Sequence, residues 1–116
     1  MAADMFKKEE NGDVKILTLM LSNFLHEDNQ KLMQEFDLII LKGSKKIVLD
    51  LSETIYISSL ILASLVYMQK LVKDSGGNLV FCNVKGRVKE ILEMTNLDKV
   101  FDIAQTRNEA VALFKA

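Results

Sequence analysis

The sequence contains no proline, no tryptophan, one cysteine and one histidine among its 116 residues. A single cysteine, Cys82, excludes an internal disulfide, and we interpret it as a small buried thiol in a reduced, cytoplasmic protein. His26 is followed by Glu27 and Asp28, but adjacent residues on a helix point in different directions, so we expect no metal site. The two acidic residues instead suit the start of a helix. We expect no cofactor either.

The chain also lacks an excess of one charge and lacks a long apolar run. Its 15 basic and 16 acidic residues argue against a nucleic-acid-binding protein, which needs clustered basic side chains. The longest apolar run, residues 60–68, is shorter than the ~20 residues of a membrane-spanning helix. A composition of 49% hydrophobic and 27% charged residues is typical of a globular protein. We therefore expect one domain over residues 1–116, with short tails at 1–3 and 115–116, and no membrane contact.

Strand and helix patterns alternate along the chain. Two strands are expected within residues 4–20, joined by a tight turn at Asn11 and Gly12. Further strands are expected at 46–51 and 78–83, and a short one near the C-terminus. Helices are expected before Gly43, over 60–74, over 88–94, and after a capping box of Thr106 and Glu109. This order predicts an α/β fold with a mixed, mostly parallel sheet of four or five strands and about four helices.

Ser58 and Ser59 stand directly ahead of the helix expected over 60–74. One interpretation is structural, because serine is a preferred N-cap residue whose hydroxyl accepts a bond from the helix backbone. The other is regulatory, since an exposed hydroxyl at a helix start can carry a phosphate without unfolding the domain. A hydrolase is a remote third hypothesis, because the one histidine, His26, lies in a different loop and the glycine-flanked nucleophile elbow is missing. A small ligand carrier is equally remote.

The helix over 60–74 begins with side chains that are apolar nearly all round. A surface helix has a polar face opposite its core stripe, so two interpretations stay open. The helix is either buried unusually deeply, under the loop around Phe24, or Leu60 and Ile61 form an exposed hydrophobic anchor. Such an anchor would bind a partner or a second copy of the chain, giving a homodimer.

Several segments in the right order resemble the STAS domain of bacterial anti-sigma-factor antagonists. They are Ile47-Val-Leu-Asp-Leu-Ser, Tyr56-Ile-Ser-Ser, Gly76-Gly-Asn-Leu-Val-Phe, residues 88–103 and Asn108-Glu-Ala, and together they cover most of residues 45–114. The resemblance implies a regulatory, non-enzymatic module that binds an anti-sigma factor, which is a serine kinase in many systems. The unphosphorylated antagonist captures that kinase and frees the sigma factor for transcription. Phosphorylation of a serine at the start of the second helix blocks capture, and a serine phosphatase reverses it.

The local family pattern is Asp-Ser-Ser-Gly-Leu-Gly. Ser58 falls on its aspartate, Ser59 on its phosphorylated serine, and Leu60 and Ile61 on the second serine and the glycine. The resemblance thus makes Ser59 the phosphate acceptor, with Ser58 as the alternative. We expect the partner-binding surface at Ser58, Ser59, Leu60, Ile61, Asn23, Phe24 and Lys85. Because the aspartate and the glycine are replaced, the alternative function is a scaffold or constitutive binder of the same fold without a phosphoswitch.

Overall fold

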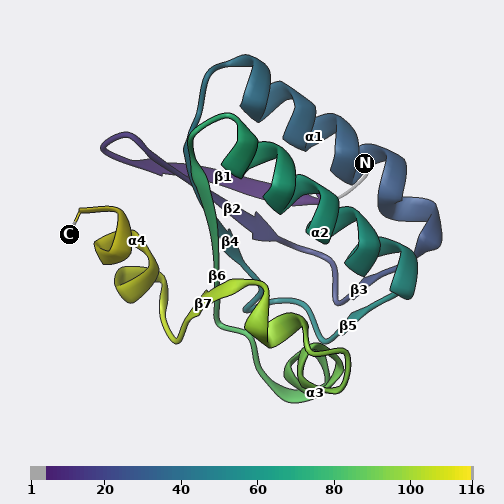
Figure 1. Ribbon diagram of the computed structural model, residues 1–116. Coiled ribbons are helices and arrows are strands. Elements are labelled where there is room, and N and C mark those ends of the chain that lie inside the picture. The colour runs from purple at the N-terminus through teal and green to yellow at the C-terminus, as the bar shows by residue number, and fades with distance from the viewer. Residues whose placement is uncertain (1–4, 116) are drawn as a thin grey trace.

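Strands and helices alternate along residues 5–115, which the computed structural model describes (Figure 1). Five strands form one sheet in the order β1-β2-β4-β6-β7, and β3 and β5 pair with each other. The strands are β1 (Phe6–Asn11), β2 (Val14–Leu19), β3 (Asn23–Phe24), β4 (Lys46–Asp50), β5 (Tyr56–Ile57), β6 (Asn78–Cys82) and β7 (Asp102–Ala104). The helices are α1 (Asn29–Leu41), α2 (Ser59–Asp74), α3 (Gly86–Met94) and α4 (Arg107–Lys115), with short 3-10 turns η1 (His26–Asp28) and η2 (Leu97–Lys99).

The sheet is mixed and mostly parallel. Strand β1 runs antiparallel to β2, and the other neighbours in this sheet run parallel. The β1–β2 turn needs a left-handed backbone, which Gly12 provides at φ +63°. These features confirm the predicted α/β fold. Lys115, which was predicted in a short tail, is the last residue of α4, and its Nζ donates to Asn11 Oδ1 at 2.9 Å. The other predicted tail residues, 1–3 and 116, lie outside the described residues.

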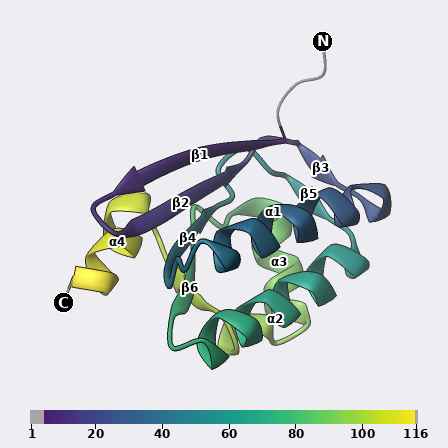
Figure 2. The same ribbon diagram turned by 90° about the horizontal axis from the view of Figure 1, so that it is seen from above.

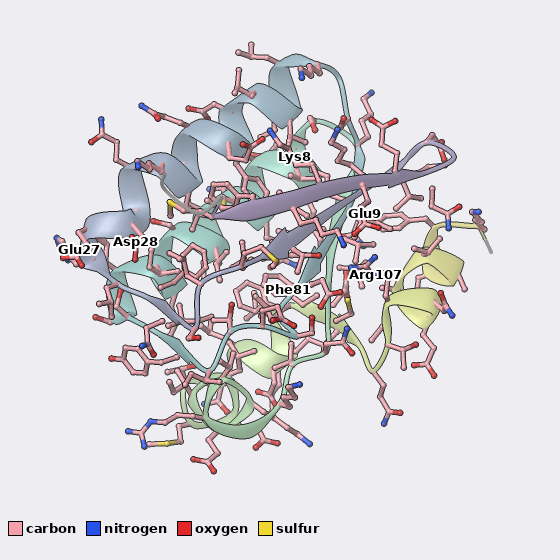
Figure 3. The ribbon with its side chains drawn as sticks, turned by 180° about the vertical axis from the view of Figure 1, so that it is seen from behind. Lys8, Glu9, Glu27, Asp28, Phe81 and Arg107 are labelled. Atoms are coloured by element: carbon pink, nitrogen blue, oxygen red, sulfur yellow. The ribbon has the colours of Figure 1, made fainter. Side chains whose placement is uncertain are left out.

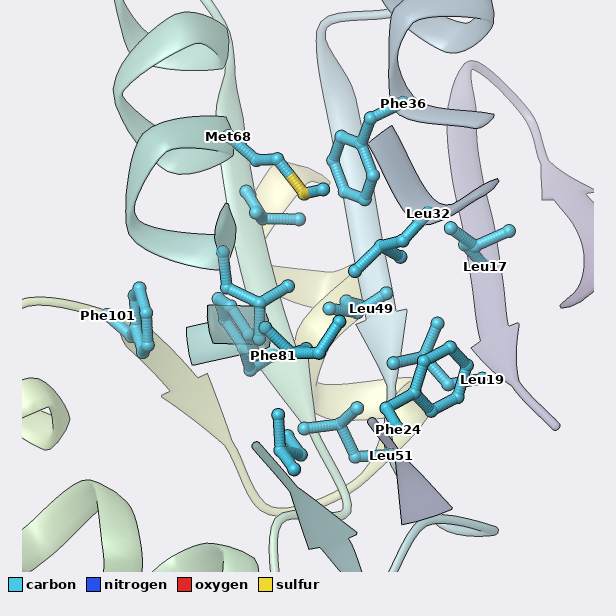
Figure 4. Packing of buried hydrophobic residues seen from close by; sticks show 14 of the residues in the cluster. Leu17, Leu19, Phe24, Leu32, Phe36, Leu49, Leu51, Met68, Phe81 and Phe101 are labelled. Carbon is cyan, nitrogen blue, oxygen red and sulfur yellow. The ribbon is translucent and has the colours of Figure 1, made fainter. Parts of the chain in front are cut away.

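Helices cover both faces of the sheet unequally. Helices α1 and α2 lie side by side on one face, whereas α4 packs on the other (Figures 1 and 2). Because side chains alternate along a strand, Leu17, Leu49 and Phe81 enter the large core under α1 and α2 (Figure 4). Val48 and Val80 enter a smaller cluster with α4. The position of the functional surface depends on the larger core.

Helix α2 is buried deeply enough to explain its apolar sequence. Its buried residues are Ile61, Leu62, Ser64, Leu65, Met68, Gln69 and Val72. The two polar members are bonded: the Ser64 hydroxyl donates to Asn29 Oδ1, and Gln69 Nε2 donates to the carbonyl oxygen of Val100 at 3.0 Å. Deep burial is therefore the correct one of the two interpretations of this helix.

Side chains cap the helix starts largely as predicted. The amide of Glu109 donates to Thr106 Oγ1 at 3.1 Å, which confirms the threonine half of the predicted capping box. The Glu109 carboxylate accepts from the amide of Gln105 at 3.3 Å, one residue before the amide that a capping box uses. Glu27 and Asp28 lie in η1, just ahead of α1 (Figure 3). None of the helices in the described part of the chain has the length and apolar character that a membrane crossing requires.

Candidate functional site

The candidate site lies where the parallel strands end. In parallel α/β sheets, ligands and partners are usually bound at the carboxyl ends of the strands. At this end of the sheet lie β3, β5, the start of α2 and the start of α3 (Figure 1). We call this surface the switch face, made of residues 20–25, 53–60 and 85–87.

The two serines at the start of α2 have different environments. Ser58 is the N-cap: its backbone is extended (φ −71°, ψ 163°) and its Oγ accepts from the amide of Ile61 at 3.3 Å. Its side chain is half-buried. Ser59 is the first residue of the helix and is exposed. Ser58 is thus the helix cap, and Ser59 carries the exposed hydroxyl.

A short parallel pairing of β3 with β5 holds the switch face together. The amides of Ile55 and Tyr56 both donate to the carbonyl oxygen of Ser22, at 2.7 and 3.1 Å. The amide of Ser58 donates to the carbonyl oxygen of Phe24 at 2.9 Å. The buried hydroxyl of Thr54 lies 3.0 Å from the carbonyl oxygen of Leu21. The strands predicted from the sequence do not include this pairing. Each strand has two residues, too few for a periodic signal.

Two residues predicted on the partner-binding surface are inaccessible. Phe24 and Ile61 are each 0% exposed and belong to the same core cluster. The expectation that their side chains contact a partner is therefore wrong, because the β3–β5 pairing turns Phe24 inward and the first turn of α2 packs Ile61 into the core. Leu60 is half-buried, and Asn23 and Lys85 are exposed, Lys85 at the N-cap of α3.

The exposed apolar side chains of the switch face lie on its loops. Ile55 is 61% exposed, Met20 40% and Leu25 38%. They lie on the two segments joined by the β3–β5 pairing, beside the start of α2. For Ile55 and Leu25 the sequence contained one signal, since an apolar residue in a predicted loop has no helix or strand to turn it inward. Large apolar side chains exposed together mark interaction surfaces.

Comparison with known proteins identifies the family. A family model described as the STAS domain matches residues 5–110. The chain belongs to the STAS domain family.

Relatives of this STAS domain carry consistent names. BtrV of Bordetella bronchiseptica, named as an anti-sigma factor antagonist, is 36% identical over 74 residues, and the alignment takes in 64% of each protein, just under two thirds of BtrV. A crystal structure from Thermotoga maritima, titled as an anti-sigma factor antagonist, has 32% identity and a TM-score of 0.86, covering 97% of this chain and 96% of that one. The anti-sigma factor antagonist SpoIIAA in its unphosphorylated form shares the fold at 11% identity, with a TM-score of 0.74 and coverage of 96% and 98%.

An ion pair between the half-buried Arg107 and the buried Asp50 joins α4 of the STAS domain to the sheet. Arg107 Nε and Nη2 donate to Asp50 Oδ2 at 3.1 and 3.0 Å, and Nη1 donates to Glu9 Oε1 at 3.0 Å. Nη2 also lies 3.0 Å from Thr18 Oγ1. Figure 3 shows Arg107 reaching Glu9 on β1. The side chain of Asp50 is 3% exposed. This ion pair therefore attaches α4 to β4 in the middle of the sheet, and we call it the fastening of α4.

The remaining oxygen of Asp50 is also bonded. Asp50 Oδ1 accepts from the amide of Ser52 at 2.9 Å and from Asn83 Nδ2 at 3.0 Å. Burial alone would raise the pKa of Asp50, but hydrogen bonds from Asn83, Ser52 and Arg107 outweigh burial and hold that pKa below its usual value. Burial and the nearby Asp50 charge raise the pKa of Cys82 to about 12, which fits the inert buried thiol predicted for this cysteine.

Removing Arg107 tests the fastening. We expect Arg107→Ala to lower the free energy of unfolding by about 3 kcal/mol, because it leaves a buried carboxylate without its counter-ion. Urea unfolding followed by circular dichroism measures the change. The control is Lys7→Ala, which removes an exposed partner 3.9 Å from Glu9 and should cost no more than about 0.5 kcal/mol. Equal effects for the two variants would contradict the assignment.

Proposed function

We propose that this STAS domain is an anti-sigma factor antagonist. In this proposal residues 1–116 act as one regulatory domain without enzymatic activity, which captures an anti-sigma factor that is also a serine kinase. Capture frees a sigma factor for transcription. Phosphorylation of Ser59 ends the capture, and a serine phosphatase restores it. The names of the relatives and the STAS fold support the antagonist function, while the phosphoswitch rests on the geometry of the switch face.

One observation carries the proposal: Ser59 is an exposed hydroxyl at the first residue of α2, on the same face as exposed apolar side chains. The helix start carries roughly half a positive charge, so it tolerates an added phosphate. The fold therefore stays intact when Ser59 is modified. The charge of the surface around Ser59 does change, because a phosphate adds about −1.5 to −2 charges there.

The switch follows from the cost of removing a phosphate from water. Docking of a partner covers Ile55 and Leu25. It also excludes water from Ser59, which lies beside them at the start of α2. An unmodified hydroxyl loses little when it is covered. A phosphate without a basic partner loses its hydration, and the complex becomes weaker. Binding is thereby switched without any rearrangement of the core.

A constitutive binder of the same fold is the second candidate. It is favoured by the replacement of the family's aspartate by Ser58 and of its glycine by Ile61, which the structure buries completely. A kinase that needs the flexible glycine would not accept this helix start. In that case the switch face would still bind a partner, but no phosphate would regulate the contact.

The phosphoswitch is tested with the serine kinase that binds the unmodified chain. With this kinase and ATP, we expect one phosphate per chain, which Ser59→Ala abolishes. We expect Ser59→Asp to weaken binding in isothermal titration calorimetry by about tenfold or more, because it places a charge in the interface. Asn108→Asp is the matched control, since Asn108 is exposed in the first turn of α4 on the other face. Equal binding by the wild type and Ser59→Asp would favour the constitutive binder.

The apolar part of the switch face is tested separately. We expect Ile55→Ser to weaken binding to the same kinase by about tenfold, because a central apolar contact is lost. The melting temperature should not fall, since Ile55 is already 61% exposed. Leu41→Ser at the end of α1, where the side chain is also exposed, should leave binding unchanged. If Leu41→Ser weakens binding and Ile55→Ser does not, the partner binds elsewhere.

A further inference from the structure

A cavity of about 410 Å³ opens at the end of the sheet opposite the switch face. It lies where the β1–β2 turn meets the loop between α1 and β4, at the upper left of Figure 1. Its lining consists of Glu10 and residues 12–15 and 42–46. None of these residues belongs to the switch face, so the cavity is a separate candidate binding site.

The lining of the cavity is basic, although the whole chain has a net charge of −1. It contains two carboxylates, Glu10 and Asp13, and four lysines, Lys15, Lys42, Lys45 and Lys46. The lining therefore has an excess of two positive charges. Because the lysines surround one hollow, their fields add there, which favours an anionic ligand.

The two carboxylates of the lining are already paired. Lys46 Nζ lies 2.8 Å from Asp13 Oδ2, and Lys15 Nζ lies 3.1 Å from Glu10 Oε1. The excess charge thus belongs to the other two lysines. Lys42 and Lys45 are exposed and make no ion pair within residues 5–115. Their ammonium groups keep their charge and their donors for a ligand.

Hydrogen bonds at both ends hold the backbone of the loop between α1 and β4. The amides of Gly43 and Ser44 donate to carbonyl oxygens of the last turn of α1 at 2.9 and 3.2 Å, so these oxygens, which would repel an anion, are occupied. Further on, the carbonyl oxygen of Lys45 accepts from the amide of Asn78 at 2.8 Å. A Cβ at Gly77 would collide with the same carbonyl group. A ligand therefore meets a loop that is already ordered, which lowers the entropic cost of binding.

We propose that this cavity binds a small molecule that carries a phosphate group, which pairs with the ammonium groups of Lys42 and Lys45. A phosphate monoester carries about −1.5 to −2 charges, which matches the excess charge of the lining. Lysine binds phosphate as a point charge. Ser44, half-buried in the lining, adds a hydroxyl.

The shape of the cavity favours a small ligand over a polymer. Its volume of 410 Å³ lies within the ~300–1,000 Å³ of small-molecule sites. An extended polyanion, such as a nucleic acid, would also meet the carboxylates of Glu10 and Asp13, which repel its backbone phosphates. This site goes beyond the proposed antagonist function and does not depend on it.

Inorganic pyrophosphate is the probe that tests the site. It is titrated into the isotope-labelled full chain, and amide chemical shifts are followed by NMR. We expect saturable changes at residues 12–15 and 42–46, and none at residues 55–60. We expect the double variant Lys42→Ala/Lys45→Ala to bind pyrophosphate about tenfold or more weakly, because two unpaired ammonium groups are lost. Its melting temperature should not fall, since both side chains are exposed.

The matched control is Lys31→Ala/Lys70→Ala, which removes the same charge from exposed positions on α1 and α2 and should leave the affinity unchanged. Equal loss of affinity in the two double variants would show that net charge alone attracts the anion, and would overturn the site. Shift changes that sodium chloride of equal ionic strength reproduces would also overturn it. Tighter binding of a single-stranded oligonucleotide at the same residues would overturn the assignment to a small molecule.

Discussion

The burial of Ile61 against the core determines where Ser59 points. The two residues are two positions apart on α2, and an α-helix turns through about 200° over two residues. When Ile61 is packed inward with Phe24, Ser59 must face outward. The β3–β5 pairing and the Ser58 cap hold the first turn in that orientation. The exposure of one hydroxyl is thus a consequence of hydrophobic packing on the opposite side of the same helix turn.

The sheet separates the switch face from the fastening of α4. Alternation along β4 sends Ile47 and Leu49 into the large core, and Val48 and Asp50 toward α4. The Asp50 carboxylate also bonds to Asn83 at the end of β6, so it ties the ends of two parallel strands to α4. The strands that carry the switch face are therefore held on one side of the sheet by an ion pair and on the other by apolar packing.

Most of the fold could be predicted because long periodic segments encode it. The helix stripes, the Asn11-Gly12 turn and the cap at Thr106 are local signals, and each corresponds to an observed element. The Arg107–Asp50 pair could not be predicted, since the two residues are 57 positions apart and meet only when α4 docks on the sheet. One local sign existed: Asp50 ends a strand whose other residues are mostly apolar.

The site was predicted in part. Ser58 and Ser59 lie at the helix start as predicted, but Phe24 and Ile61, which were expected on the partner-binding surface, are buried. Sequence composition reports how much apolar surface exists and not which way it faces. In the structure Ile61 faces the core, and the exposed apolar surface comes from Ile55, Met20 and Leu25.

The most direct test of the account maps the partner on the protein. Amide chemical shifts of the isotope-labelled chain are followed while the unlabelled kinase is added. The account predicts that the largest changes occur at Asn23, Ile55 and Ser59, with α4 unaffected. Changes concentrated on α4 or on the β1 edge, with Ser59 unchanged, would contradict it.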